Sequence, residues 1–261
     1  MRKFHQNRAA IYALHPWQVV EEEFRPEHNH RSEAIFSLGN GYMGLRGTFE
    51  EGLPCQIPST PGTYINGIYE TEPIIYGEFM ARQPEEYQTM VNVTDWKGIK
   101  IQVEHEEFSM LQGEVEQYSR VLDLKEGVLR RELIWRSLEG RRTRLSFERF
   151  ISQVDKHLAY QRCSVTPLNW SGQITFRSQV NGSVRNLHHL REQALTVLST
   201  AHTNEGGMIL SKTKRSGIAV ACAVTHRVTP EAPIMGSASS DCLDFMVRFK
   251  GDEGQTYTLD K

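Results

Sequence analysis

The sequence predicts a mainly β protein, built as one large antiparallel β-sandwich with few short helices. Three observations lead to this prediction. Apolar and polar residues alternate along most of the chain after residue 97, turn-forming residues separate these stretches at short intervals, and few segments have a helical pattern. In residues 97–108, Ile99, Ile101 and Val103 share one face of a strand while polar residues occupy the other. One apolar and one polar face is typical of a half-buried antiparallel strand.

The same alternation continues through the rest of the chain, with turn signals such as Glu126-Gly127 and Glu139-Gly140 between the segments. Two further segments, 15–24 and 186–193, have patterns compatible with a helix. The final residues, 254–261, look like the start of another strand, which suggests a piece of a longer protein. Strands are predicted within 97–108, 115–124, 127–137, 142–153, 157–167, 171–180, 194–203, 207–213, 217–228 and 242–251.

The first 95 residues have a different character, with less regular alternation and several prolines. Prolines 54, 58, 61 and 73 interrupt any long element. We therefore expect long ordered loops that lie across a sheet, and such loops are usually functional.

One stretch in this region, SLGNGYMGLRGTFEEG at residues 37–52, has the glycine spacing of a dinucleotide-binding turn. That fold requires a helix directly after the glycines, whose N-terminus binds the pyrophosphate. Here Gly47, Gly52 and Pro54 follow, so a helix is disfavoured. A β-hairpin or bulge with glycines at positive φ is the preferred interpretation. It explains the polar residues Asn40, Arg46, Glu50 and Glu51 less well.

Other candidate chemistry is weak. The adjacent acids Glu50/Glu51, Glu85/Glu86 and Glu106/Glu107 could suggest glycoside hydrolysis, but strand neighbours point to opposite faces, so solvated surfaces are expected instead. His28-x-His30 and His188-His189 lack a third metal ligand and are interpreted as surface loops. The aromatic and polar residues of 64–69 and 92–96 could bind sugar, but capping of the core is favoured. Nucleophilic catalysis has no signature.

Charge and cysteine content limit the cellular setting. The formal net charge is −2 and no long run of like charge occurs, which argues against a nucleic-acid partner. The N-terminus lacks the apolar core of a signal peptide, and no apolar stretch is long enough to span a membrane. The four widely spaced cysteines do not resemble a disulfide framework. We therefore expect a cytoplasmic protein with neither membrane nor nucleic-acid partners, and with no metal.

Four segments in order carry a family resemblance: PWQVVEEEF (16–24), SEAIFSLGNGYMGLRGTFEEG (32–52), TPGTYINGIYE (60–70) and MVNVTDWKGIKI (90–101). Together they resemble the N-terminal domain of glycoside hydrolase family 65, which contains the inverting phosphorylases of maltose, trehalose and kojibiose. The resemblance implies a β super-sandwich, followed in the parent protein by a helical linker and an (α/α)₆ barrel. In that barrel a glutamate is the general acid, and inorganic phosphate attacks the disaccharide to release β-glucose 1-phosphate. No metal or organic cofactor takes part.

By this resemblance, residues 1–261 are an N-terminal β-sandwich domain truncated before the linker and the catalytic barrel. No catalytic, cofactor-binding or metal-binding residue is carried over, because the family's catalytic residues lie in the barrel. The expected role is structural: the domain packs on the barrel of the same parent chain and supports a homodimer. Asn40, Tyr42 and Arg46 are predicted to face that barrel or the rim of its active site. A free-standing carbohydrate-binding module, a complete small glycosidase, and a parent that hydrolyses α-glucosides are the alternatives.

Overall fold

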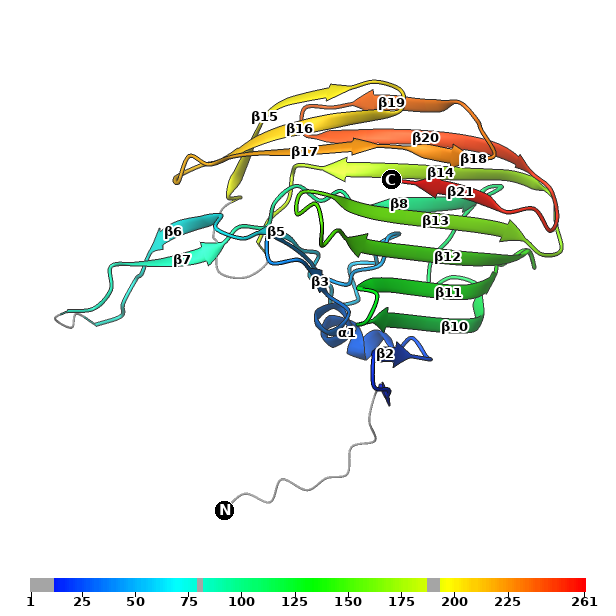
Figure 1. Ribbon diagram of the computed structural model, residues 1–261, viewed down its shortest axis with the longest axis horizontal. Coiled ribbons are helices and arrows are strands. Elements are labelled where there is room, and N and C mark those ends of the chain that lie inside the picture. Colours follow the sequence, from blue (N-terminus) through cyan, green and yellow to red (C-terminus); the bar gives the residue numbers. More distant parts are fainter. Residues whose placement is uncertain (1–11, 79–81, 187–192) are drawn as a thin grey trace, which may run out of the picture.

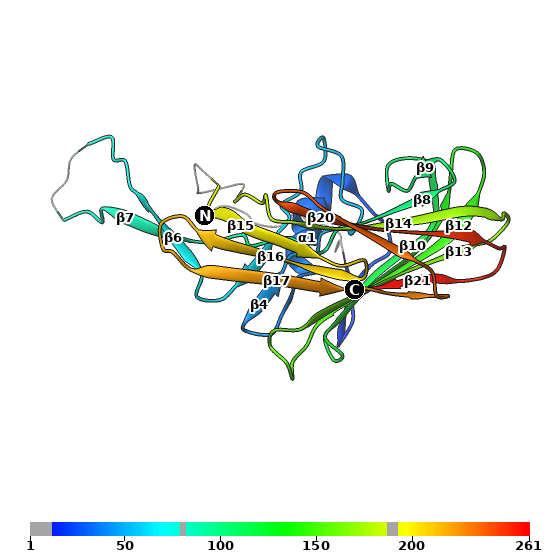
Figure 2. The same cartoon turned by 90° about the horizontal axis from the view of Figure 1, so that it is seen from above.

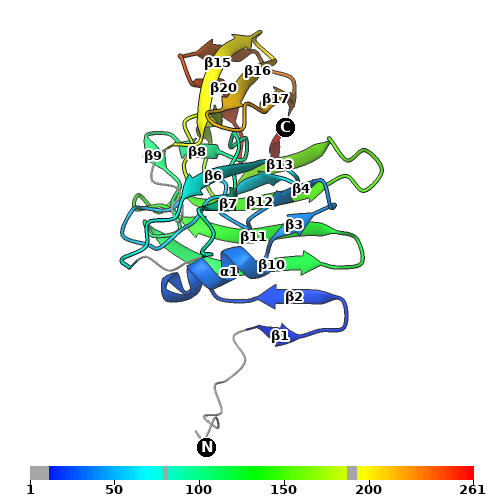
Figure 3. The same cartoon turned by 90° about the vertical axis from the view of Figure 1, so that its left-hand side faces the viewer.

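The computed structural model describes residues 12–78, 82–186 and 193–261, and two layers of antiparallel strands dominate it (Figure 1). A smaller three-stranded sheet lies against the second of these layers (Figures 2 and 3). The first layer has the spatial order β1 (Ala13–Leu14), β2 (Gln18–Glu21), β10 (Glu114–Asp123), β11 (Val128–Arg136), β12 (Arg142–Ile151), β13 (Ala159–Pro167), β21 (Tyr257–Asp260) and β18 (Arg227–Thr229). The second has the order β19 (Ile234–Ala238), β20 (Cys242–Gly251), β14 (Gly172–Asn181), β8 (Ile99–Val103) and β9 (Glu106–Glu107), and the smaller sheet has β15 (Leu195–His202), β16 (Gly206–Thr213) and β17 (Ala219–Thr225).

Apolar side chains from alternate strand positions fill the space between the layers. On β8, Ile99, Ile101 and Val103 are fully buried and the residues between them are exposed. They belong to one continuous apolar core with Leu145 and Phe147 of β12. The predicted mainly β architecture is therefore confirmed, and its cause is the alternation read from the sequence.

The N-terminal third lies against one end of the sandwich. It contains the only regular helices among the described residues, together with a small sheet and a two-stranded ribbon that projects from the body (Figures 1 and 2). None of these helices is long or apolar enough to cross a membrane. The elements are η1 (Pro26–His28), α1 (Asn29–Ile35), the sheet of β3 (Leu38–Gly39), β4 (Met43–Leu45) and β5 (Thr63–Ile65), and the ribbon of β6 (Tyr69–Pro73) and β7 (Glu86–Met90).

The prediction of a helix at residues 15–24 is wrong. Gln18–Glu21 form strand β2, because Val19 and Val20 pair with β10 in the antiparallel ladder. The short helix lies instead at Asn29–Ile35. The second expected helix, at 186–193, falls mostly on residues 187–192, outside the described part of the chain, as do His188 and His189.

Three arginines are fully buried at inward positions of neighbouring strands: Arg120 on β10, Arg131 on β11 and Arg149 on β12. A buried charge is costly unless an opposite charge and hydrogen bonds accompany it. The acids that accompany these arginines come from the N-terminal third. We call the set of six residues the arginine cluster: Arg120, Arg131, Arg149, Glu21, Glu50 and Glu51.

Glu50 is the central acceptor of the arginine cluster. Its Oε1 lies 2.6 Å from Nη2 of Arg149 and its Oε2 lies 2.8 Å from Nη2 of Arg131. Arg131 also donates to both carboxylate oxygens of Glu51, at 2.7 and 2.5 Å. The guanidinium of Arg131 is 4.1 Å from the ring centroids of both Phe49 and Phe147, which adds cation–π attraction.

The two acids differ in how firmly they are ionised. Burial by itself would raise the pKa of Glu50, but the guanidiniums of Arg149 and Arg131 outweigh burial and hold the pKa below its ordinary value. For Glu51, burial outweighs the attraction of Arg131, and the pKa is raised. Glu50 is therefore the more firmly ionised of the two counter-ions.

His226 is a second buried titratable group, and it joins the end of β17 to β14. Its Nδ1–H donates to the backbone oxygen of Glu205 at 3.0 Å, and its Nε2 accepts from the hydroxyl of Ser178 at 2.9 Å. The bond that Nε2 accepts from Ser178 requires the neutral imidazole, because both ring nitrogens of the protonated form are donors. Burial, with a smaller contribution from Lys261, lowers the pKa of His226 to about 3.

Replacing Glu50 with Gln is expected to reduce the free energy of unfolding by about 3–5 kcal/mol, because the buried Arg149 loses its anionic partner and Arg131 keeps only Glu51. Urea denaturation measures this loss. Glu51→Gln is the matched control and should cost less, since Arg131 keeps Glu50. Equal losses for the two variants would contradict the central role of Glu50.

The low pKa of His226 predicts a pH-dependent stability. The folded state binds this proton only near pH 3, whereas the unfolded state binds it near pH 6.5, so stability falls as the pH drops between these values. The loss should approach about 1.4 kcal/mol per pH unit. His226→Gln should flatten this slope in urea denaturation, whereas His202→Gln, at an exposed position on β15, should leave it unchanged.

Candidate functional site

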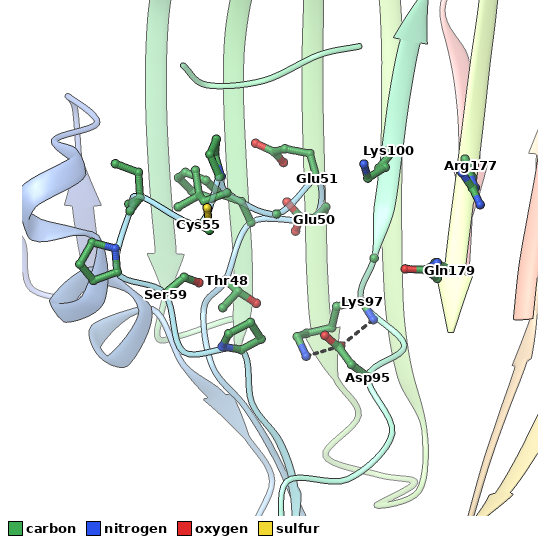
Figure 4. A pocket seen from close by; sticks show the side chains of 18 residues that line it. Thr48, Glu50, Glu51, Cys55, Ser59, Asp95, Lys97, Lys100, Arg177 and Gln179 are labelled. Carbon is green, nitrogen blue, oxygen red and sulfur yellow. Dashed lines mark hydrogen bonds and ion pairs between the residues drawn. The ribbon is translucent and has the colours of Figure 1, made fainter. Parts of the chain in front are cut away.

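A cavity of about 700 Å³ lies between the loop of residues 53–61 and the strands β8 and β14 (Figure 4). We call it the loop pocket. Loop prolines, the hydroxyl of Ser59 and the thiol of Cys55 line one side. Lys100, Arg177 and Gln179 line the other, as Figure 4 shows. The pocket brings the N-terminal loops and several charged side chains together, which makes it the candidate site.

The charged groups of the loop pocket are held in ion pairs. Asp95 lies 2.5 Å from Nζ of Lys97, which also donates to the hydroxyl of Thr63 at 2.8 Å. Burial alone would raise the pKa of Asp95, but Lys97 outweighs it and the pKa is lowered. Glu50 and Glu51 face the pocket's floor and are bound by the arginine cluster. Each carboxylate that lines the pocket is thus engaged as a structural counter-ion.

The two cations on the β8–β14 side are also paired. Lys100 and Arg177 are directly opposite each other in the ladder between β8 and β14. Two like charges at such positions repel each other and destabilise the pair. Nζ of Lys100 contacts Glu107 at 2.8 Å and Nε of Arg177 contacts Asp244 at 3.0 Å, on opposite sides. The cations therefore diverge from each other.

The expectation of solvated surfaces is wrong for Glu50 and Glu51. The segment that carries them is not a regular strand, so neighbouring side chains are free to meet the same partner, Arg131. Glu85 and Glu86 are exposed as expected. Glu106 is half-buried and receives a hydrogen bond from Arg141 at 2.9 Å, whereas Glu107 is exposed.

The glycine-rich stretch is a β-hairpin, as its preferred interpretation states. Leu38 pairs with Leu45 and Gly39 with Gly44, and Gly41 in the turn has a φ of 83°. Such a φ is accessible to glycine at little cost. A strand, β4, follows the turn where a dinucleotide fold would have a helix.

The turn residues Asn40 and Tyr42 bind the loop between β12 and β13. Asn40 accepts hydrogen bonds from the N–H groups of Tyr42 and Met43 at 3.0 and 2.8 Å, which fixes the turn. Its Nδ2 donates to the backbone oxygens of Ser152 and Lys156 at 2.8 and 3.1 Å. The ring of Tyr42 meets the ring of His157 edge-on, with centroids 4.4 Å apart.

Arg46 lies away from Asn40 and Tyr42. Its Nη2 is 3.6 Å from Oε2 of the buried Glu33 on α1 and donates to the backbone oxygen of His30 at 3.3 Å. The structure therefore brings Asn40 and Tyr42 together and places Arg46 on the helix side. Their predicted role at an interface with another domain stays a prediction.

The remaining candidates have structural surroundings. His28 ends η1 and His30 lies in α1, so the expected surface loop is helical. Among the described residues no group of three or more His, Cys, Asp or Glu side chains could hold a metal ion. Asn92 is buried, accepts from the N–H of Thr63 and donates to the backbone of Pro61, and Trp96 belongs to the core. This agrees with the favoured core-capping interpretation of residues 92–96.

Sequence reasoning missed the arginine cluster, although a signal for it was present. Each arginine lies two residues from a buried apolar residue and so shares its face of the strand. The pairs are Arg120 and Leu122 on β10, Arg131 and Leu133 on β11, and Arg149 and Phe147 on β12. A charged residue in the apolar register of three consecutive strands indicates a buried ionic partner.

Gly47 and Gly44 allow a direct test of why the stretch is rich in glycine. A Cβ at Gly47 would lie 2.5 Å from the backbone oxygen of Phe36 and 2.8 Å from Nη2 of Arg120, whereas a Cβ at Gly44 meets nothing within 4 Å. Gly47→Ala is expected to cost about 1–3 kcal/mol of folding stability. Gly44→Ala should be neutral or slightly stabilising. Thermal denaturation compares the two, and a neutral Gly47→Ala would show that the packing at this point is loose.

Comparisons with known proteins agree with this geometry. Residues 19–261 match the model of the glycosyl hydrolase family 65 N-terminal domain. An alpha,alpha-trehalose phosphorylase of Thermoanaerobacter brockii is 34% identical over 98% of this chain and 35% of its own length. A kojibiose phosphorylase of Caldanaerobacter subterraneus is 37% identical over 65% of this chain and 20% of its own.

A solved structure of a proposed kojibiose phosphorylase from the human microbiome shares the fold, with a TM-score of 0.84 at 21% identity, over 95% of this chain and 32% of that one. The chain therefore spans about a third or less of the length of these relatives. Since the family model covers nearly all of the described sandwich, the chain belongs to the glycosyl hydrolase family 65 N-terminal domain family.

Proposed function

We propose that this chain is the non-catalytic N-terminal domain of a cytoplasmic, inverting disaccharide phosphorylase. The parent enzyme converts an α-linked disaccharide and inorganic phosphate into β-glucose 1-phosphate and a free sugar. The proposal is supported by relatives that are named trehalose and kojibiose phosphorylases and that are about three times as long as this chain. Their additional length has room for a catalytic barrel, which is the proposed partner of this domain.

One observation carries the non-catalytic part of the proposal. Inverting cleavage of a glycosidic bond requires an acid that is free to give its proton to the leaving group. In the loop pocket, Glu50, Glu51 and Asp95 are each bound to an arginine or lysine. A carboxylate held in this way compensates a buried cation and is not free to serve the reaction. Among the described residues, apolar side chains of the two layers fill the interior of the sandwich and form one continuous core.

The proposed role is therefore structural. The domain packs on the barrel of the same parent chain and supports a homodimer, and its N-terminal loops shape the rim of the active site. Asn40 and Tyr42 fit this role because they fix the position of the β12–β13 loop relative to the hairpin. Arg46 fits it less directly, since its guanidinium is engaged by Glu33 and His30.

The 261-residue chain is expected to release no sugar phosphate from trehalose or kojibiose in the presence of inorganic phosphate. The trehalose phosphorylase of Thermoanaerobacter brockii serves as the positive control. Phosphate-dependent breakdown by the chain alone would refute the non-catalytic assignment, and release of free glucose without phosphate would favour a hydrolase.

Isothermal titration of the same chain with millimolar kojibiose or trehalose tests the alternative of a carbohydrate-binding module. No binding heat is expected, because the described residues that line the loop pocket include no exposed aromatic side chain to stack on a sugar. Saturable heat would replace the structural role with a sugar-binding one.

A further inference from the structure

Strand β17 is an edge strand that lacks the features that usually prevent an edge from pairing with another strand. Among the described residues it pairs with β16 alone. Its sequence, AVACAVT, contains no charged residue, no proline and no glycine. Exposed edge strands generally carry charges, prolines or bulges that prevent pairing with another strand. An edge of seven uncharged residues is therefore a template for one more strand.

The ladder identifies which groups of β17 are open. The N–H of Thr213 donates to the oxygen of Ile218 at 2.9 Å, and the N–H of His226 donates to the oxygen of Glu205 at 2.7 Å. Ladder bonds of an antiparallel pair recur at every second residue. Even-numbered residues of β17 therefore bond to β16. The odd-numbered residues direct their N–H and C=O groups to the free edge: Ala219, Ala221, Ala223 and Thr225.

A cavity of about 200 Å³ follows this edge. Its lining includes every residue from Val220 to Thr225. Successive residues of a strand point to opposite faces, so a cavity lined by all of them runs along the backbone edge and not over one face. We call it the β17 edge groove.

The wall opposite β17 is mainly apolar. It contains Met43 and Ile65, which are paired neighbours on β4 and β5, together with Trp96 and Leu158. Thr94 also lines the groove, is 1% exposed, and its hydroxyl has no hydrogen-bond partner among the described residues. A buried hydroxyl without a partner costs free energy, so Thr94 offers an occupant of the groove a polar contact.

The groove has a second backbone edge on its β13 side. Gln161 of β13 exchanges both of its backbone hydrogen bonds with Lys261, each 2.8 Å long. Since ladder bonds recur at every second residue, Ala159 directs its N–H and C=O to the side on which Gln161 bonds Lys261. Ala159 and Lys261 both line the groove. A strand placed here would meet backbone partners on β17 and on β13.

We propose that the β17 edge groove receives an extended, uncharged segment as an added strand. The segment comes from the additional polypeptide that longer family members carry. This chain covers 35% of the length of the trehalose phosphorylase. This source rests on the proposed function. An added strand gains affinity from main-chain hydrogen bonds and selectivity from alternate side chains. A second copy of this chain fits poorly, because its own β17 edge is recessed behind the wall of Met43, Ile65 and Leu158.

Amide hydrogen exchange of the 261-residue chain tests the groove, with the peptide acetyl-TVTVTV-amide as the probe. Millimolar peptide is expected to slow exchange at Ala219, Ala221, Ala223 and Thr225 by about tenfold or more. The control peptide acetyl-TPTPTP-amide lacks alternate N–H groups and should have no effect. Unchanged exchange with the first peptide would overturn the proposal, as would equal protection by both.

Two variants at one position sharpen this test. Ala221→Pro removes an N–H that points to the free edge and leaves the bonds to β16 intact, so it should fold and lose peptide protection. Ala221→Ser keeps the N–H and should retain protection. If Ala221→Pro does not fold, as judged by its urea transition, the comparison of the two peptides on the unmodified chain still tests the proposal. Protection that appears without peptide and grows with protein concentration would indicate a second copy and overturn the proposal.

The source of the strand is tested in the Thermoanaerobacter brockii trehalose phosphorylase. Its amides equivalent to Ala219, Ala221, Ala223 and Thr225 should be protected with no peptide added. Rapid exchange there would refute an origin within the longer polypeptide. Neither exchange experiment measures sugar chemistry, so a failure of the groove is distinguishable from a failure of the proposed function, which the phosphorolysis assay decides.

Discussion

The pairing of Glu50 with Arg131 and Arg149 inside the sandwich is the constraint on which the N-terminal part of the structure depends. Arginines at inward positions of adjacent strands cannot remain buried without anions. The segment that carries Glu50 and Glu51 supplies them and therefore must run between the sheet of β10–β12 and the edge of β8. The N–H of Ile99 donates to the backbone oxygen of Glu50 at 2.9 Å, so the same residue also joins this segment to the second layer.

The position of the other N-terminal elements follows from that constraint. The loop after Glu51 lies over β8 and β14 and creates the loop pocket, while the hairpin before it reaches the β12–β13 loop through Asn40 and Tyr42. That hairpin and loop form part of the wall facing β17. The long N-terminal loops thus close one end of the sandwich (Figure 1).

The success and failure of sequence reasoning have separate physical causes. Strands after residue 97 were predictable because alternation is a local signal that one buried face imposes directly. The helix expected at 15–24 was wrong because a pairing partner, β10, lies about a hundred residues away and outweighs local propensity. The acids at 50 and 51 were placed on the surface because a rule for regular strands was applied to an irregular segment. The hairpin at 38–45 was foreseen from its glycines, but the partners of Asn40 were not, since they lie over a hundred residues along the chain.

The sequence by itself determined the β-sandwich class, the approximate strands, the hairpin and the family, since these depend on local periodicity and on ordered motifs. Only the tertiary structure decided that Glu50 and Glu51 are counter-ions, that Asp95 and Lys97 neutralise each other, and that β17 has a free edge lying in an apolar groove. These facts arise from contacts between segments far apart in the chain. Burial strengthens the attraction between a charge and an oppositely charged partner, and it destabilises a charge that has none. For Glu50 and Glu51 that partner comes from a distant segment, so the residues adjacent in sequence do not identify it.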